Sequence, residues 1–138
     1  MASMVFCLVL CAFVKVDPSL TGKWVAKEKG EISEITFDKS GYISFLINDK
    51  VFGGKNYSVQ NMTVDMTYEV YTRAKPHNID LILIAQGSLQ EVRRIRGIYD
   101  MENPNTLRVK FNFQGAERPN NFNTEEDDGT MVFERAKE

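Results

Sequence analysis

The chain has 138 residues, of which 43% are apolar and 26% charged, and its 17 basic and 19 acidic side chains leave a net charge of −2. A chain of this length forms about one domain with a single core. The balanced charge excludes the broadly basic surface that is typical of nucleic-acid binding. We therefore expect one globular domain in residues 17–138, preceded by a hydrophobic N-terminal segment in residues 1–16.

The N-terminal segment contains an apolar run from Met4 to Val14. This run is shorter than the ~20 residues of a transmembrane helix, and it fits the hydrophobic region of a secretory signal peptide. We therefore expect a periplasmic or secreted protein, with membrane association only through this segment if it is not cleaved. No Lys or Arg precedes the run and the cleavage pattern is poor. The alternative is therefore a cytoplasmic protein in which the segment plugs one end of the fold.

The thiol and imidazole groups give no basis for a metal site. Both cysteines, Cys7 and Cys11, lie in the N-terminal segment, so residues 17–138 hold no disulfide framework and no Cys–His metal spacing. His77 is the single histidine of the chain, which excludes a two-histidine metal site. We expect no metal and no cofactor.

Strand-like alternation dominates the chain from residue 22 onward. Apolar residues recur at every second position, most clearly over residues 64–70, and turn sequences such as Asp38–Gly41 and Asn103–Asn105 separate the segments. The run from Ile79 to Ile84 is almost continuously apolar, which is typical of a strand covered on both faces. The expected strands are residues 24–27, 34–37, 43–47, a short strand before Gly53, and residues 64–70, 79–84, 92–99, 107–113 and 130–135.

These eight or nine strands lie at short spacings, and residues 17–138 show no sustained helical period. The pattern predicts an all-β protein, an antiparallel up-and-down barrel of about eight strands.

The two ends of the barrel sequence carry a resemblance to a known superfamily. Gly22-Lys23-Trp24 begins the first strand, and Phe133-Glu134-Arg135 ends the last. Gly22 and Trp24 resemble the Gly-x-Trp signature of lipocalins and related calycins. In that superfamily an arginine from the closing region packs over the tryptophan and seals one end of the barrel. The resemblance implies this role for Arg135, with an attraction of about 1 kcal/mol.

A second resemblance covers residues 20–135. It is carried by Pro76-His77-Asn78-Ile79-Asp80-Leu81, Gly97-Ile98-Tyr99, Leu107, Arg118-Pro119 and Phe133-Glu134-Arg135. In this order they resemble a bacterial domain family of unknown function, lipocalin-like and mostly exported. The resemblance implies that Asp80, Tyr99 and Arg118 are structural residues. Family members often carry a cysteine shortly after the leucine, where Val109 follows here, so no role for that thiol is carried over.

Asp80 has a physical interpretation of its own. It lies within an apolar run, where an unpaired carboxylate is costly to bury. We expect Arg118, held in a polar loop by Pro119, to form a bidentate pair with Asp80 that ties the loop to the barrel. The alternative is that Arg118 binds an anionic group of a ligand at the mouth of the barrel.

The inward-facing side chains of the predicted barrel are apolar and aromatic. A barrel of about eight strands is just wide enough to be filled by side chains or to hold one small ligand. Because both arrangements need the same alternation, a pocket and a solid core both remain open. The candidate ligand-binding residues are Phe45, Met66, Tyr68, Leu83, Phe111, Phe113 and Met131, and Leu81 shares their face.

We expect a lipocalin-like barrel that binds or transports a small hydrophobic or amphipathic molecule without catalysis. The first alternative is a protein-interaction module with a solid core, whose partner meets the Arg93–Arg96 face or the acidic loop Glu125–Asp128. The second alternative is an enzyme that uses His77 and Asp80, although no serine has the spacing of a nucleophile elbow. The acidic loop lacks the alternating pattern of an EF-hand, so we interpret it as a solvated loop rather than a calcium site.

Overall fold

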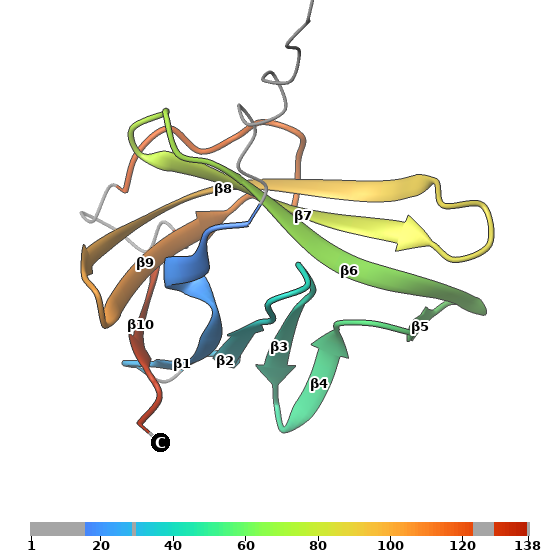
Figure 1. Ribbon diagram of the computed structural model, residues 1–138, viewed down its shortest axis with the longest axis horizontal. Helices are drawn as coiled ribbons and strands as arrows, with labels where there is room; N and C mark the ends of the chain where they lie inside the picture. Colours follow the sequence, from blue (N-terminus) through green and yellow to red (C-terminus); the bar gives the residue numbers. More distant parts are fainter. Residues whose placement is uncertain (1–15, 29, 123–128, 138) are drawn as a thin grey trace, which may run out of the picture.

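The computed structural model describes residues 16–28, 30–122 and 129–137, which form an antiparallel β-sheet and a short 3-10 helix (Figure 1). The predicted signal peptide or plug and the acidic loop Glu125–Asp128 lie outside the described residues. The elements are η2 (Pro18–Leu20), β1 (Gly22–Ala26), β2 (Ile32–Phe37), β3 (Ile43–Ile47), β4 (Lys50–Gly53), β5 (Tyr57–Val59), β6 (Met62–Tyr71), β7 (His77–Ala85), β8 (Glu91–Asn103), β9 (Thr106–Phe111) and β10 (Met131–Arg135).

The strands follow an up-and-down path around the sheet. Their order is β4-β3-β2-β1-β10-β9-β8-β7-β6-β5, so strands that follow one another in the chain are paired, apart from β4 and β5. The first and last strands pair with each other, with Trp24 opposite Arg135 and Ala26 opposite Phe133. The all-β, antiparallel prediction is confirmed, and the sheet curls into a nearly closed barrel (Figure 1).

The expected strand number of about eight is too low, because the described residues form ten strands. The strand before Gly53 is present as β4, whereas β5 has no counterpart among the expected strands. β5 comprises only Tyr57–Val59, and a segment of this length is too short for alternation to identify it. Both β4 and β5 are short edge strands of the sheet.

The barrel closes between β3 and β6 around Gly54. The Gly54 N–H donates to the Ile43 C=O and the Gly54 C=O accepts from the Met66 N–H, both at 2.8 Å. The neighbouring Gly53 has a φ of +95°, and a Cβ there would lie 2.7 Å from Met66 Sδ and 2.9 Å from the Ile43 oxygen. A side chain at Gly53 would therefore be strained and would also clash, so a glycine is required where the sheet closes.

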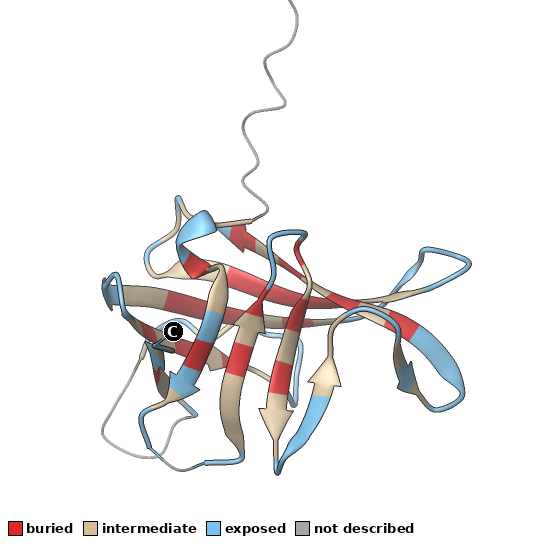
Figure 2. Cartoon of the chain, turned by 60° about the horizontal axis from the view of Figure 1, so that its bottom comes forward, coloured by how far each residue is buried: buried red, intermediate tan, exposed pale blue. Residues whose placement is uncertain are grey.

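The inward faces of the strands form one hydrophobic core (Figure 2). The alternation predicted for β6 is confirmed, because its inward apolar side chains are at most 9% exposed and the residues between them are only partly buried. The largest fully buried side chains are Trp24, Tyr99, Phe37 and Phe133. These come from β1, β2, β8 and β10, so the core holds together strands that lie far apart in the chain.

A crossover segment, residues 112–122, lies on the outer face of the sheet. Arg96 Nη1 of β8 donates to the Ala116 C=O at 3.2 Å, and Arg118 Nη1 donates to the Gly97 C=O at 2.8 Å. On this outer face Ile82 and Ile98 are only 3% and 2% exposed. The prediction that both faces are covered along Ile79 to Ile84 is confirmed at the centre of β7, where the residues from Ile79 to Ile82 are buried.

One end of the barrel is closed by η2. Leu20 is fully buried, and its C=O accepts a 2.8 Å hydrogen bond from Trp24 Nε1. Asp17 caps the helix by accepting from the Ser19 N–H at 3.0 Å, and its other oxygen accepts from the Tyr99 hydroxyl at 2.8 Å. Asp17 thus fastens the short helix to the wall of the barrel.

The stack of Arg135 on Trp24 expected from the lipocalin resemblance is present at this end. The guanidinium carbon of Arg135 lies 4.3 Å from the Trp24 ring centroid. Its Nη1 donates to the Thr21 C=O at 3.0 Å, and its Nη2 donates to the C=O groups of Ser19 and Pro104 at 2.7 and 3.1 Å. Arg135 therefore seals what we term the closed end of the barrel.

Candidate ligand-binding site

A cavity of about 910 Å³ lies at the other end of the barrel. This open end carries Ala26 of β1, Ile32 of β2 and Met131 of β10, all distant along their strands from the closed end. The volume falls within the range of ~300–1,000 Å³ that is typical of small-molecule sites. The cavity is lined by Ala26, Lys27, Glu28, Gly30, Glu31, Ile32, Glu102, Thr106, Phe111, Phe113, Gly129, Thr130, Met131, Val132 and Phe133.

Three of the predicted ligand-binding residues line this cavity, namely Phe111, Phe113 and Met131. The rings of Phe111 and Phe113 lie 5.6 Å apart with an interplanar angle of 51°. Phe111 is 7% exposed, whereas Phe113 is 43% exposed. The cavity therefore has an aromatic wall whose inner ring is fixed in the core and whose outer ring faces solvent.

Phe113 does not belong to a strand, in contrast to the expected strand 107–113. β9 ends at Phe111, and the Asn112 side chain then accepts hydrogen bonds from the backbone N–H groups of Gln114 and Gly115 at 3.1 and 2.9 Å. An asparagine that binds its following backbone in this way forms a turn, which ends the alternation. The turn places Phe113 at the rim of the cavity.

The other candidate residues lie deeper in the barrel. Phe45, Met66 and Tyr68 are 5%, 9% and 2% exposed and belong to the packed core, and Leu83 packs against that core. Phe45 contacts Phe111 edge to face, with ring centroids 6.2 Å apart. Phe111 thus belongs both to the packed core and to the lining of the cavity.

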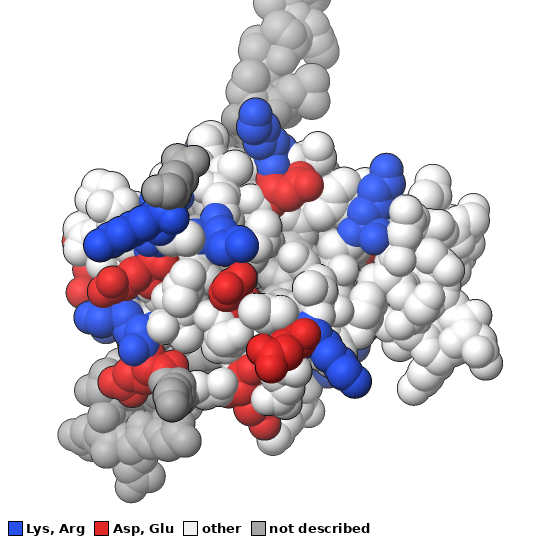
Figure 3. Space-filling view, turned by 90° about the horizontal axis from the view of Figure 1, so that it is seen from below, with Lys and Arg blue, Asp and Glu red and all other residues white. Residues whose placement is uncertain are grey.

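The charged side chains of the cavity lining are mainly acidic. Glu28, Glu31 and Glu102 line it together with Lys27, whose Nζ lies 3.6 Å from Glu134 Oε1. All three cavity glutamates are exposed. On the face seen from below, Figure 3 shows acidic and basic side chains interspersed, with no continuous basic area.

Asp80 is 8% exposed and contacts two arginines from different elements. Arg118 Nη1 of the crossover segment donates to Oδ1 at 2.6 Å, and Arg94 Nη1 of β8 donates to Oδ2 at 2.8 Å. The expected Asp80–Arg118 contact is confirmed, but its bidentate geometry is wrong because Arg94 takes the second oxygen. Arg94 also binds Glu91, and this hydrogen bond raises the pKa of Arg94 and lowers the pKa of Glu91.

The cluster Arg93–Arg96 holds the crossover segment in place. Arg93 Nη2 donates to the Phe113 C=O at 2.7 Å, and Arg96 holds the C=O of Ala116 as described above. Their guanidinium groups therefore have partners within the chain, and Arg93 fixes the backbone of an aromatic residue at the rim of the cavity.

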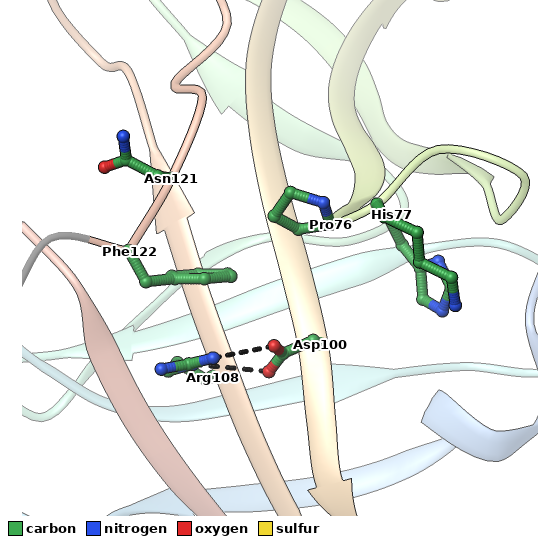
Figure 4. Close-up of a pocket in the computed structure, with 7 residues that line it drawn as sticks. Pro76, His77, Asp100, Arg108, Asn121 and Phe122 are labelled. Atoms are coloured by element: carbon green, nitrogen blue, oxygen red, sulfur yellow. Dashed lines mark hydrogen bonds and ion pairs between the residues drawn. The ribbon is translucent and has the colours of Figure 1, made fainter.

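A second, shallower cavity of about 440 Å³ lies on the outer surface beside β8 and β9 (Figure 4). Its main feature is a bidentate pair in which Arg108 donates to Asp100 at 3.3 and 2.7 Å. The Phe122 ring lies over the Arg108 guanidinium, 4.3 Å from its carbon. The contact between Phe122 and Arg108 anchors the end of the crossover segment to β9, and Asp100 balances the charge of Arg108.

His77 lines the second cavity and has partners different from those of Asp80. Its Nδ1 lies 3.1 Å from the Ala74 C=O, and its ring centroid is 5.2 Å from that of Tyr99. His77 and Asp80, the two residues considered for an enzyme, both belong to β7 but contact different residues.

The hydroxyl of Tyr68 is buried in the core without a hydrogen-bond partner. Burial raises the pKa of Tyr68 to about 12, and the carboxylates of Asp17 and Asp38 add to the shift. Burial and the hydrogen bond to Asp17 likewise raise the pKa of Tyr99. Both tyrosines are therefore neutral at physiological pH.

Within the described ranges, no group of three or more His, Cys, Asp or Glu residues could hold a metal ion. No helix in that part of the chain is long and apolar enough to cross a membrane.

Comparisons of the chain with models of protein families, with curated proteins and with solved structures find no match. The functional inference therefore rests on the residues and the geometry of the site.

Two parts of the arrangement were missed in the sequence although signals were present. Asp17-Pro18 is the start signal of a helix, an N-cap residue followed by proline at the first helical position. Glu28 and Glu31 lie between β1 and β2, next to inward-facing Ala26 and Ile32. Because a turn between two strands lies at one end of a barrel, both glutamates could have been predicted at a mouth of the barrel.

Proposed function

We propose that this protein binds a small apolar or amphipathic molecule at the open end of its barrel and performs no catalysis. The observation that carries the proposal is the cavity of about 910 Å³, whose lining combines Phe111, Phe113 and Met131 with polar and charged side chains. Concave sites in which aromatic and apolar side chains adjoin polar groups that fix orientation are typical of small-molecule binding, and an amphipathic molecule fits a lining of this kind. The closed end is sealed by Trp24 and Arg135, so a ligand enters from the open end.

The barrel in this proposal is lipocalin-like, and the protein is exported. The Gly22-x-Trp24 sequence, the Arg135 stack and the short helix across the same end support the lipocalin-like assignment. The apolar run from Met4 to Val14 supports export to the periplasm or out of the cell.

A protein-interaction module is the second candidate. It is favoured by the packed core and by two exposed apolar side chains, Leu89 between β7 and β8 and Val92 in β8, which are 77% and 49% exposed. Exposed apolar side chains mark a contact surface where they gather into a patch. In this case the cavity would stay empty and the partner would meet the β7–β8 hairpin.

Titration of the full chain with the neutral fluorophore N-phenyl-1-naphthylamine tests the proposal. We expect saturable one-to-one binding. Phe113→Ala should weaken it about fivefold, because an aromatic contact is worth on the order of 1 kcal/mol. Met131→Trp should weaken it further, because the larger ring occupies the cavity.

Tyr71→Ala is the matched control, since Tyr71 is 47% exposed and does not line the cavity. Its affinity should equal that of the unmodified chain. Absence of saturable binding, or an equal loss in Phe113→Ala and Tyr71→Ala, would overturn the proposal and favour the interaction module.

A further inference from the structure

The charges around the open-end cavity do not suit a fatty acid or another anionic amphiphile. Its charged lining residues are Glu28 and Glu31 between β1 and β2, Glu102 beside the β8–β9 turn, and a single lysine, Lys27, which already has Glu134 within 3.6 Å. A carboxylate or sulfate group placed at this rim would meet a net negative charge. A ligand with an anionic head is therefore disfavoured by electrostatics, whatever its apolar part gains.

The aromatic wall adds a second attraction for positive charge. Phe111 and Phe113 present two rings, inclined at 51° and only 5.6 Å apart, on the cavity lining. The faces of aromatic rings attract cations, with ~0.5–1 kcal/mol per contact at exposed sites and more where water is excluded. Rings that bind an apolar chain can thus also favour a positively charged head beside the carboxylates.

We propose that the molecule bound at the open end is an organic cation, a protonated or quaternary amine that carries an apolar chain or ring. This inference rests on the proposed ligand-binding function and narrows it to one class of ligand. The apolar part lies against Ile32, Met131 and the two phenylalanines, and the ammonium group lies at the rim near Glu28 and Glu31. The glutamates are exposed, so each contributes modestly and the preference weakens as salt is added.

Displacement of N-phenyl-1-naphthylamine from the full chain by decylamine and by decanoate tests the inference. The two competitors have the same chain length and opposite charges at pH 7. We expect decylamine to displace the fluorophore at about tenfold lower concentration than decanoate, because attraction of one head and repulsion of the other add. The ratio should fall towards one in high salt.

Two matched double variants separate the rim from the overall charge. Glu28→Gln with Glu31→Gln should reduce the ratio by about twofold per charge removed, with each competitor's displacement read against the affinity of the same variant for the neutral fluorophore. Glu69→Gln with Glu117→Gln changes the net charge equally, but neither residue lines the cavity, so the ratio should stay as in the unmodified chain.

The outcomes distinguish this inference from the function beneath it. Fluorophore binding without a preference for decylamine, or with an equal effect of both double variants, would overturn the amine assignment and leave ligand binding intact. Complete absence of fluorophore binding would overturn both.

Discussion

Gly97 sets the distance between β8 and β9 beneath the cavity. A Cβ at this position would lie 2.5 Å from Phe111 Cδ1 and 2.6 Å from the Lys110 oxygen. Because the second of these atoms belongs to the backbone, a side-chain rotation cannot relieve the clash and the strands must move apart. The glycine therefore determines how close the Phe111 ring lies to β8.

We predict that Gly97→Ala lowers the free energy of unfolding by about 1–3 kcal/mol, the usual cost of overpacking a core. Urea denaturation gives this value, and N-phenyl-1-naphthylamine affinity should fall with it because Phe111 is displaced. Gly30→Ala is the control for stability alone, since a Cβ there meets nothing within 4 Å but Gly30 lines the cavity. Equal stability of both variants would show that β8 and β9 are not tightly spaced.

Asp17 makes the closed end sensitive to acid. Its partial burial by itself raises the pKa of Asp17, but hydrogen bonds from Ser19 and Tyr99 outweigh burial and hold that pKa below its ordinary value. A carboxyl group with a lowered folded-state pKa stabilises the fold above its unfolded pKa, about 3.9. This contribution is lost as the pH falls through the lower, folded-state pKa.

We predict that Asp17→Asn is less stable than the unmodified chain by about 1 kcal/mol at pH 7, the net worth of a hydrogen bond to a charged group partly exposed to water. The difference should shrink below about pH 4 and vanish in stronger acid. Urea unfolding at a series of pH values measures it. A difference independent of pH would mean that the lost interaction is one of geometry and not of charge.

At the scale of single elements, the crossover segment depends on Asp80. This buried carboxylate joins Arg94 of β8 to Arg118 of the segment. Loss of Arg118 leaves Arg94 as a counter-ion, so the variant avoids the larger cost of a buried charge without any partner.

We predict that Arg118→Met destabilises the protein by about 1–3 kcal/mol and raises amide hydrogen exchange in residues 112–122 while β2 and β3 keep their protection. The double variant with Asp80→Asn should show a coupling of about 0.5–3 kcal/mol. Arg73→Met, at an exposed turn position, serves as control. Additive effects of Arg118→Met and Asp80→Asn would contradict a direct link between the segment and β7.

The strands around Asp80 show what the sequence could predict and what it could not. The alternation in β6 and the continuous apolar run in β7 were sufficient for those strands, because each pattern follows from burial of one face or of both. Asp80 drew attention to Arg118 because a buried carboxylate needs a partner. Its second partner, Arg94, lies diagonally across from Asp80, because the register of β7 against β8 places Asp80 opposite Arg96 and Ile82 opposite Arg94. This contact could not be predicted without the register. Register depends on the whole sheet and not on local sequence.

The prediction of the cavity from the sequence had a different limit. Phe111 and Met131 were predicted from alternation, and Phe113 from an alternation that in the structure ends at Phe111. Alternation does not tell how far the packed side chains fill the barrel. Phe45 and Met66 belong to the same inward face and lie in the core. Where the core ends and the cavity begins depends on how side chains from different strands meet, as Phe45 meets Phe111.

At the scale of the whole molecule, the barrel depends on the pairing of its first and last strands. β10 is hydrogen-bonded to both β1 and β9, and it contributes the fully buried Phe133 as well as Arg135. Trp24, the single tryptophan of the chain, lies beneath Arg135 with no exposed surface. Its fluorescence therefore reports directly on closure of the barrel.

We predict that deletion of residues 131–138 opens the sheet between β1 and β9, shifts the Trp24 emission to longer wavelength and abolishes cooperative urea unfolding. Deletion of residues 137–138 alone should leave both unchanged, because Ala136, whose N–H donates to the Lys23 C=O, and all of β10 are retained. If the longer deletion kept a buried tryptophan and a cooperative transition, the remaining strands would form a stable open sheet. The closed end would then owe its stability to η2 and not to the meeting of the two chain ends.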